Sequence, residues 1–416
     1  MNKKQNNLIK YNRKTLIIIS IIALILIIGV FTLAINIKRQ TKAEKQQEVI
    51  KEEASQNNNV LESKEDNSNK LKLNNYMQKA EEKLKELTED EVIAQLFLVG
   101  THTTSDFEKL KEKQFGGYLF FADFFKDKTE KQIQNEINKF NEVSKVPLLI
   151  AVDEEGGNVV RVSSNKKLIN EPFKYSSEIY QNGGFEEIWQ DTINKSKFLS
   201  NLGINLNLAP VVDICEKETD YMYKRSLKQG KEITATFAKT VISASKESNV
   251  SYALKHFPGY GNNVDTHKTT STDERSYEDI YNNDLEPFRV AIEEGAEAVL
   301  ISHNIVTSID PENPASLSPK IHKLLREDLK FEGIIITDAM NMGAIVNEYT
   351  AEEAIINAIS AGNDIIIVTI NKASKENYDD IIKAVKTGIN NGKITKENIY
   401  KKAKNVIAWK YYKGML

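Results

Sequence analysis

The sequence predicts an α/β protein built as a (β/α)8 TIM-type barrel, and two observations support this prediction. From about residue 75 onward, short apolar runs alternate with longer amphipathic segments, about eight times over roughly 340 residues. Polar residues recur just after many of these runs. An open doubly wound sheet would also alternate strands with helices, but a barrel gathers the strand ends into one mouth, and this is the arrangement we expect.

Residues 16–36 are predicted to be a transmembrane anchor, because the segment from Leu16 to Ile35 has no charged residue and is long enough to cross a bilayer. Basic residues within residues 1–15 favour a cytoplasmic tail, although further basic residues beyond the apolar run weaken that bias. The alternative is a cleaved signal peptide and a secreted protein, since Thr32-Leu33-Ala34 loosely fits a cleavage site. The apolar run is longer than a usual signal core, so we expect a single-pass protein of the cell membrane with its barrel outside the cytoplasm.

Residues 37–74 are expected to form a polar linker or stalk. They are rich in Lys, Glu, Gln, Asn and Ser and contain no aromatic residue, so they cannot bury enough apolar surface to fold alone. Residues 75–416 then form the barrel, which we expect to be monomeric.

Within the barrel, each short apolar run is expected to be a strand and each amphipathic stretch a helix. The expected strands are residues 93–99, 117–121, 147–152, 204–214, 251–255, 298–302, 333–337 and 364–369. The expected helices include residues 129–143, 185–202, 233–248, 277–294, 319–329 and 351–361.

Composition excludes several classes of function. The formal charge is only -3, so the composition gives no indication of a basic surface for nucleic acid. A single cysteine, Cys215, excludes an internal disulfide. No cysteine and histidine cluster has metal-ligand spacing, and the chemistry considered below requires neither a metal nor a cofactor.

Charged side chains gather where the expected strands end. They are Asp153, Glu154, Glu155 and Arg161 after the third strand, Asp213 and Arg225 after the fourth, Lys255 and His256 after the fifth, His303 after the sixth and Asp338 after the seventh. Carboxylates accept hydrogen bonds from hydroxyl groups, and Lys or Arg donate to ring oxygens and carbonyls. These residues therefore suit a polar ligand that is rich in hydroxyl groups.

The segment from Lys255 to His267 is the most informative part of the sequence, because it places a cation, two imidazoles and a carboxylate around a glycine-hinged loop. Asp265 and His267 are two residues apart, so an extended segment turns both side chains to one face. A carboxylate beside an imidazole fixes its tautomer and raises its pKa, which makes a proton shuttle near neutral pH.

A glycosidase needs a carboxylate beneath the anomeric carbon and a proton donor above the departing oxygen. Asp338 and the pair of Asp265 and His267 could supply these groups. Position alone leaves a second reading of Asp338 open, which is that it caps a following helix.

Taken in order, these motifs resemble glycoside hydrolase family 3, specifically its single-barrel β-N-acetylglucosaminidases. The matching motifs are Asp153-Glu154-Glu155-Gly156-Gly157 with Arg161, Arg225-Ser226, Lys255-His256-Phe257-Pro258-Gly259, Asp265-Thr266-His267, Pro314-Ala315-Ser316-Leu317-Ser318 and Thr337-Asp338-Ala339-Met340. The resemblance implies a retaining mechanism with Asp338 as the nucleophile and His267, oriented by Asp265, as the general acid and base. It also implies that Asp153, Arg161, Arg225, Lys255 and His256 bind the N-acetylglucosamine unit.

Together with the anchor, the resemblance implies an exo-acting enzyme that faces the cell wall and trims terminal N-acetylglucosamine from peptidoglycan fragments. The sequence departs from the family pattern at Tyr260, where a second histidine is usual, and the loop from Lys255 to His267 is one residue shorter than the common form. Two alternatives stay open: a β-glucosidase or phosphorolytic glycosidase, and a silent sugar-binding barrel whose shortened loop no longer brings His267 to the site.

Overall fold

A computed structural model describes residues 75–102, 111–261, 265–266, 269–369 and 378–415. The chain divides into two compact units, Met1–Lys72 and Leu73–Leu416, and the described residues all lie in the second. The expected basic tail, anchor and stalk over residues 1–74 lie outside the described residues. Among the residues that are described, none of the helices combines the length and the apolar character needed to span a bilayer.

Eight parallel strands form the central sheet, in the order β10-β1-β2-β3-β4-β5-β7-β9. Their bounds are β1 Phe97–Thr101, β2 Gly117–Phe120, β3 Leu149–Val152, β4 Leu206–Asn207, β5 Ser251–Phe257, β7 Ala298–Ile301, β9 Ile334–Thr337 and β10 Ile366–Thr369. A bridge between Ile336 and Ile365 joins the two ends of this order, and Thr337 N donates to Ile365 O at 3.0 Å. The sheet is therefore an almost closed barrel, as the sequence predicted.

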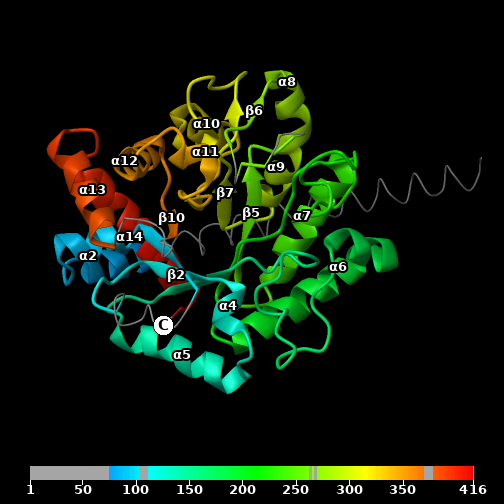
Figure 1. The fold of residues 1–416 in the computed structure, drawn as a ribbon, viewed down its shortest axis with the longest axis horizontal. Helices are drawn as coiled ribbons and strands as arrows, with labels where there is room; N and C mark the ends of the chain where they lie inside the picture. Colours follow the sequence, from blue (N-terminus) through cyan, green and yellow to red (C-terminus); the bar gives the residue numbers. More distant parts are fainter. Residues whose placement is uncertain (1–74, 103–110, 262–264, 267–268, 370–377, 416) are drawn as a thin grey trace, which may run out of the picture. The chain divides into compact units, whose positions relative to one another are not determined.

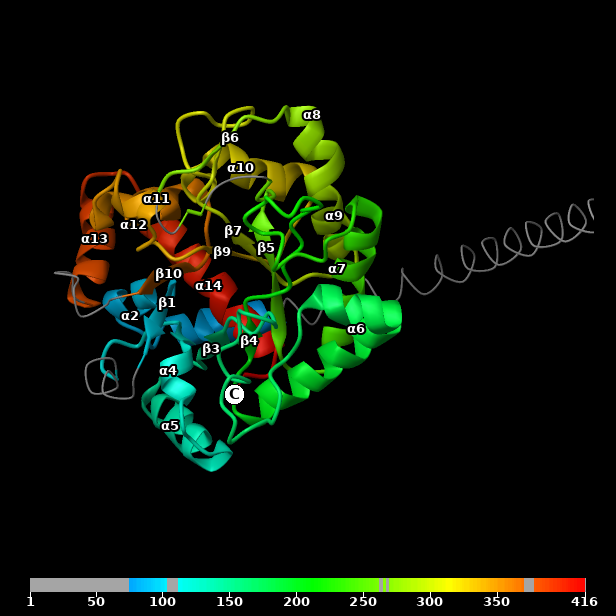
Figure 2. The same cartoon turned by 45° about the vertical axis from the view of Figure 1, so that its right-hand side comes forward.

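Helices surround the strands (Figures 1 and 2). Their bounds are α2 Glu89–Ala94, α4 Ala122–Phe125, α5 Glu130–Val143, α6 Ser176–Asn201, α7 Lys231–Ser245, α8 Tyr277–Asp279, α9 Leu285–Glu293, α10 Pro319–Lys323, α11 Gly343–Val346, α12 Ala351–Ala361, α13 Tyr378–Asn390 and α14 Lys396–Tyr412. A threonine caps the start of three helices, α2, α5 and α12. Its hydroxyl accepts from the backbone N–H of the residue three positions later, and the Glu or Gln side chain of that residue accepts from the threonine N–H. This reciprocal cap fixes where each helix starts.

Most of the predicted strands differ from the structure by one or two residues at an end, and two differ by more. Residues 93 and 94 end α2 and do not begin a strand, because the Thr88 cap starts a helix that runs through them, and β1 begins at Phe97. Residues 204–214 pair regularly only over Leu206–Asn207. Pro210 in that segment has no N–H to donate, so the remaining pairing there is a single bridge between Val211 and Lys255.

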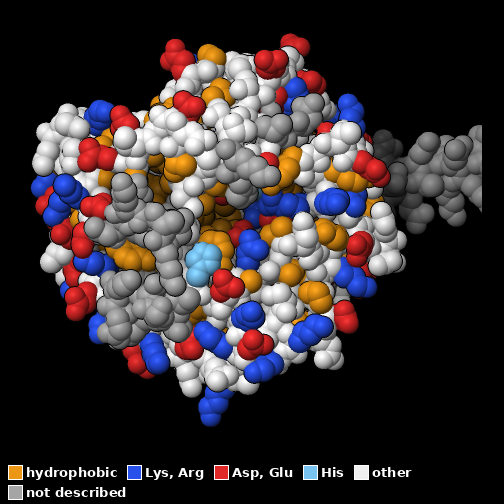
Figure 3. All heavy atoms as spheres, in the orientation of Figure 1, with side chains coloured by type: hydrophobic (Ala, Val, Ile, Leu, Met, Phe, Trp, Pro, Cys, Tyr) orange, Lys and Arg blue, Asp and Glu red, His pale blue; other side chains and the backbone are white. Residues whose placement is uncertain are grey.

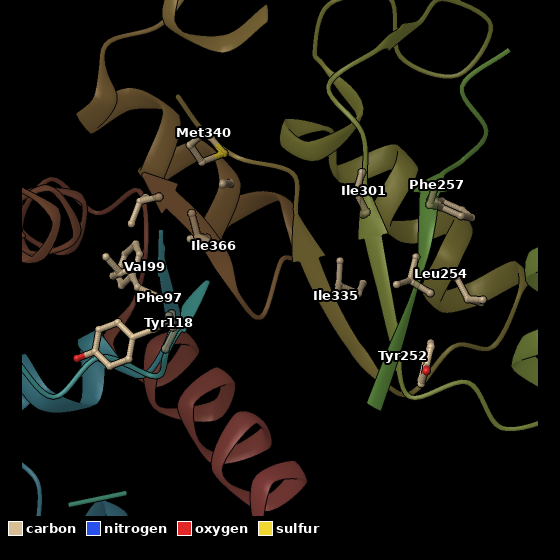
Figure 4. Close-up of a cluster of buried hydrophobic side chains, with 14 of the residues drawn as sticks. Phe97, Val99, Tyr118, Tyr252, Leu254, Phe257, Ile301, Ile335, Met340 and Ile366 are labelled. Carbon is tan, nitrogen blue, oxygen red and sulfur yellow. The ribbon is translucent and has the colours of Figure 1, made fainter. Parts of the chain in front are cut away.

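Side chains alternate between the inside and the outside of the barrel, as strand geometry requires. The inner cluster includes Leu98, Ala151, Ala253 and Ile336, and Val406 and Trp409 of α14 pack against it. The outer cluster lies between the strands and the helices, and Figure 4 shows members such as Phe97, Leu254 and Ile335. Burying each such side chain contributes about 1.5–3 kcal/mol, so apolar packing holds the barrel and leaves its mouth available for polar groups.

A second, two-stranded parallel sheet lies beyond the barrel. It consists of β6 Thr272–Asp273 and β8 Ile305–Val306, and β6 lies beside α8 in Figures 1 and 2. This sheet ties the chain after β5 to the chain after β7.

Candidate active site

The inward alternation of side chains continues past the ends of three strands. Asp153, Lys255 and Asp338 each stand two residues after an inward-facing apolar residue, namely Ala151, Ala253 and Ile336. Since a strand repeats its facing every two residues, these three groups point into the mouth of the barrel. In Figure 3, acidic and basic side chains meet beside a hollow near the centre of this face.

Lys255 and Arg225 share one buried carboxylate, Glu155, at the mouth. Lys255 Nζ lies 2.8 Å from Asp153 Oδ1 and 2.6 Å from Glu155 Oε1. Arg225 donates to both Glu155 oxygens, from Nη2 at 2.6 Å and from Nε at 2.8 Å. Two cations and two carboxylates are thus locked in one network, which leaves their orientations little freedom.

The charges of this network are fixed by their neighbours. Burial alone would raise the pKa of Glu155, but Arg225 and Lys255 hold that pKa well below the ordinary carboxyl range. Burial likewise favours the neutral amine of Lys255, yet Asp153 and Glu155 raise its pKa above the ordinary value. Glu155 and Lys255 therefore both stay ionised at neutral pH.

Arg161 is placed by a carboxylate that does not face the mouth. Glu154 is fully buried, and it accepts from the backbone N–H groups of Arg161 and Val162, both at 2.8 Å. The chain from 153 to 163 therefore folds around this carboxylate, and the Arg161 guanidinium comes to lie 3.6 Å from Asp153. Four of the predicted sugar-binding residues, Asp153, Arg161, Arg225 and Lys255, are brought together.

His256 joins the same group through Arg225 and is oriented by Asp213. Its Nδ1 lies 2.7 Å from Asp213 Oδ2, and its Nε2 lies 3.5 Å from Arg225 Nη2. Because a carboxylate can only accept, Asp213 places the His256 proton on Nδ1 and orients the ring. Asp213 itself is buried, with 2% exposure.

Asp338 follows β9 and turns its carboxylate to the same mouth. Its Oδ1 accepts from the Ala339 N–H at 2.8 Å, and its own N–H donates to Ile301 O at 2.9 Å. Burial acts to raise the pKa of Asp338, but His303 and His256, together with the Ala339 N–H, hold the pKa below its ordinary value. A carboxylate that stays ionised in a partly buried position is what a nucleophile requires.

His303 fixes the turn that follows Asp338. Its Nε2 lies 3.0 Å from the Ala339 carbonyl oxygen, which can only accept, so this nitrogen carries the proton. Its Nδ1 lies 2.7 Å from Ser316 Oγ. The ring is therefore held on both sides, and its place beside Asp338 is set by the fold.

The predicted acid/base pair is described only in part. His267 lies outside the described residues, so its role remains a prediction. Asp265 is half-buried and forms a hydrogen bond with Tyr221, whose pKa is raised to about 12 by burial and by this carboxylate. The charges of Arg225 and Asp338 also act on the Tyr221 hydroxyl, which places the Asp265 side chain near the mouth.

Sequence reasoning assigned no role to three residues of this site, and placed them only among the polar residues at strand ends. They are Glu155, Asp213 and His303. Each acts through a partner that is distant in sequence, such as the 70 residues between Glu155 and Arg225. The available signal was their position at strand ends. Within the part of the chain that the structure describes, no group of three His, Cys, Asp or Glu side chains is arranged to hold a metal ion.

Comparisons with known proteins agree with this barrel fold. A family model described as the N-terminal domain of glycosyl hydrolase family 3 matches residues 80–408. A β-hexosaminidase of Nitrosomonas eutropha is 29% identical over 273 residues, which cover 64% of this chain and 77% of the relative. A β-hexosaminidase of Methylobacillus flagellatus is 28% identical over 290 residues, which cover 66% and 79%.

Among solved structures, a glycoside hydrolase family 3 β-N-acetylglucosaminidase from Paenibacillus sp. superposes with a TM-score of 0.72 and 27% identity. The match covers 79% of this chain and 63% of that one, so the present chain spans less than two thirds of its length. The fold and the site thus define a glycoside hydrolase built on a (β/α)8 barrel. The chain belongs to glycosyl hydrolase family 3, as its motifs indicated.

Proposed function

We propose that the protein is a retaining exo-β-N-acetylglucosaminidase that removes terminal N-acetylglucosamine from peptidoglycan fragments. The observation that carries the proposal is the position of Asp338, which is half-buried at the end of β9, accepts from the Ala339 N–H at 2.8 Å, and is near enough to His256 and Lys255 for both to lower its pKa. A negative nucleophile thus lies beside a network that is built to accept and donate hydrogen bonds. The names of the β-hexosaminidase relatives support the choice of sugar.

The reaction would proceed in two steps. Asp338 attacks the anomeric carbon while His267 donates a proton to the leaving oxygen, so the glycosidic bond breaks as a covalent glycosyl-enzyme forms. His267 then takes a proton from water, whose oxygen attacks the same carbon and releases both the sugar and Asp338. Asp265 would orient the imidazole and stabilise its charged form. Two inversions leave the configuration of the anomeric carbon unchanged.

The buried network would hold the sugar ring. Asp153 can accept from a pair of hydroxyls, while Lys255 and Arg161 can donate to oxygens of the ring substituents. Because Glu155 and Asp213 already fix Lys255, Arg225 and His256, these side chains lose little freedom when substrate binds. The site is therefore prepared for one sugar unit before the sugar arrives.

The proposed place of action rests on the amino-terminal sequence. The uncharged run within residues 16–36 would anchor the enzyme in the cell membrane, and the polar residues 37–74 would hold the barrel on the wall side. Protease treatment of intact cells tests this arrangement, because an external barrel would be cleaved without cell lysis. Protection of the barrel until the cells are broken would contradict it.

The function is tested by measuring the release of chromophore by the purified full-length protein. Aryl N-acetylglucosaminide and aryl glucoside are compared, each with and without inorganic phosphate. We expect turnover of the N-acetylglucosaminide alone and no dependence on phosphate. Preference for the glucoside, a requirement for phosphate, or no turnover would each overturn the proposal, in favour of a β-glucosidase, a phosphorylase or a sugar-binding barrel respectively. Product analysis with defined muropeptides then tests the aglycone.

A further inference from the structure

Tyr260 has a larger role in the structure than its place in the sequence suggests. It follows β5, at the position where the family pattern has a second histidine, and its side chain is buried with 2% exposure. Its hydroxyl lies 2.9 Å from Thr266 Oγ1 and accepts from the Thr266 backbone N–H at 3.0 Å. One buried hydroxyl thus holds both the main chain and the side chain of Thr266, which stands between Asp265 and His267.

The backbone of Tyr260 is held by the active site itself. Its N–H donates to Asp213 Oδ1 at 2.8 Å, and its carbonyl accepts from Asn304 Nδ2 at 3.3 Å. Asp213 is the carboxylate that orients His256. Tyr260 therefore joins the sugar-binding network to Thr266 through hydrogen bonds at its N–H and its hydroxyl.

Thr266 is held from a second direction by the chain that follows Asp338. Its carbonyl accepts from the Ala344 N–H at 3.1 Å, and Ala344 lies in α11, only six residues beyond Asp338. Thr266 is thus fixed between Tyr260 and the turn that carries the proposed nucleophile. Both of these anchors are buried.

A second tyrosine reaches the same segment from another part of the chain. Tyr221, from the connection between β4 and α7, packs on Tyr260 with ring centroids 5.7 Å apart and forms a hydrogen bond with Asp265. Asp265 therefore forms a hydrogen bond with Tyr221, and its neighbour Thr266 forms one with Tyr260. The two tyrosines contact one another. A ring pair of this kind stabilises both side chains beyond their burial.

We propose that Tyr260, braced by Tyr221, is the positioning residue that fixes Asp265 and Thr266 relative to Asp338. This inference rests on the proposed function, because that function makes Asp265 the carboxylate that orients the proton donor. Proton transfer requires the donor within hydrogen-bond reach of the leaving oxygen, whereas attack by Asp338 does not. Loss of the tyrosine hydroxyl should therefore slow reactions that need a proton donor and spare those that do not.

The test compares Tyr260→Phe with the wild-type full-length protein on two N-acetylglucosaminides, one with a good aryl leaving group and one with a poor alkyl leaving group. We expect kcat/KM for the poor leaving group to fall at least tenfold more than for the good one. Tyr221→Phe should change the ratio in the same direction by a smaller factor. Thr266→Ser, which keeps a hydroxyl at this position, should retain the wild-type ratio.

The matched control is Tyr252→Phe. Tyr252 is also buried and lies within β5, the strand that precedes Tyr260, but its hydroxyl lies 2.9 Å from Ser196 on α6. We expect this variant to act equally on both substrates. Thermal unfolding of every variant separates a loss of folded protein from a loss of positioning, and Thr266→Val replaces Tyr260→Phe if the latter does not fold.

Two outcomes would overturn the inference, and they can be told apart. If wild type turns over both substrates and Tyr260→Phe changes them by the same factor, Tyr260 has only a structural role and the proposed function stands. If wild type turns over neither substrate, the proposed function fails and the positioning role fails with it.

Discussion

Lys255 Nζ and Glu155 Oε1 lie 2.6 Å apart, and both side chains are almost fully buried. The pair is not isolated, because Glu155 also accepts twice from Arg225 and Lys255 also contacts Asp153. A buried ion pair that lacks such partners offers little net stability, since removing its charges from water is costly. Here every charge has a partner, and the network can hold the proposed sugar-binding groups in place without substrate.

Glu155→Gln is expected to destabilise the protein and to weaken substrate binding. The amide keeps the shape of the side chain but removes the negative charge that Arg225 and Lys255 share, so the free energy of unfolding should fall by about 3–5 kcal/mol. Substrate KM should rise at least tenfold. Urea denaturation and steady-state kinetics measure the two effects.

The control for Glu155→Gln is Glu86→Gln, which removes an exposed ion pair with Lys83. Water screens that pair, so its loss should change the free energy of unfolding by less than about 1 kcal/mol. Equal effects of the two substitutions would contradict the role of the buried network.

Asp338→Ala is expected to abolish turnover and leave the fold intact. Removal of a nucleophile costs on the order of 10⁴- to 10⁶-fold in kcat, while the small side chain leaves the barrel packing unchanged. Added azide should occupy the vacated space and attack the anomeric carbon once. The product would then be a glycosyl azide of inverted configuration, which nuclear magnetic resonance detects. Rates near wild type, or a rescued product of retained configuration, would refute the assignment of Asp338.

Sequence patterns predicted those parts of the protein that depend on local spacing. Asp338 was found because it directly follows an apolar run, and alternation along that run turns its side chain inward. The start of the first strand was misplaced because residues 93 and 94 are apolar, and apolar residues suit a buried helix as well as a buried strand. The cap at Thr88 starts a helix that includes both residues. The helix start depends on the reciprocal hydrogen bonds between Thr88 and Glu91, which the apolar pattern alone does not reveal.

Roles that depend on partners far apart in the chain could not be predicted. Asp213 orients His256, which lies 43 residues further along the chain. The backbone of Tyr260 donates to Asp213 and accepts from Asn304. A single sequence contains the side chains but not their pairing, which only the closed barrel sets. The replacement of histidine by Tyr260 therefore looked like a departure from the family pattern, whereas in the fold it is a point of attachment.

Lys410 is expected to lower the stability of the protein in a pH-dependent way. Its side chain is fully buried near the start of β1, where Nζ donates to Gln95 Oε1 at 3.0 Å. Burial lowers the pKa of Lys410 from 10.5 to about 7. Below the lower value both folded and unfolded chains carry the proton, and the cost of burying it is fully present. Between the two values only the unfolded chain keeps the proton, so stability rises with pH.

Lys410→Met should therefore stabilise the protein more at pH 6 than at pH 9, by a difference of about 3 kcal/mol in the free energy of unfolding. Urea denaturation at the two pH values measures it. Lys401→Met, an exposed lysine on the same helix, is the control and should give no such difference. A stabilisation that is independent of pH would show that Lys410 is neutral, or charged, throughout this range.

Gly261→Ala tests whether the loop after β5 is held by close packing. Gly261 has a φ of 59°, and a β-carbon there would lie 2.7 Å from Arg275 Nη2. Arg275 cannot move aside easily, because Asp273 and Asp284 bind its guanidinium from two sides, the latter at 2.7 Å. Backbone strain and this clash should act together.

Gly392→Ala separates the two effects, because Gly392 has a similar φ of 74° but open space around the added carbon. That substitution should cost only the strain of a left-handed backbone, roughly 1–2 kcal/mol, and leave kcat/KM unchanged. Gly261→Ala should cost more and lower kcat/KM at least tenfold, because the displaced chain adjoins Tyr260 and hence Asp213. Since the two variants share the strain but not the clash, equal losses of stability and unchanged activity in both would mean that the contact with Arg275 does not hold the loop.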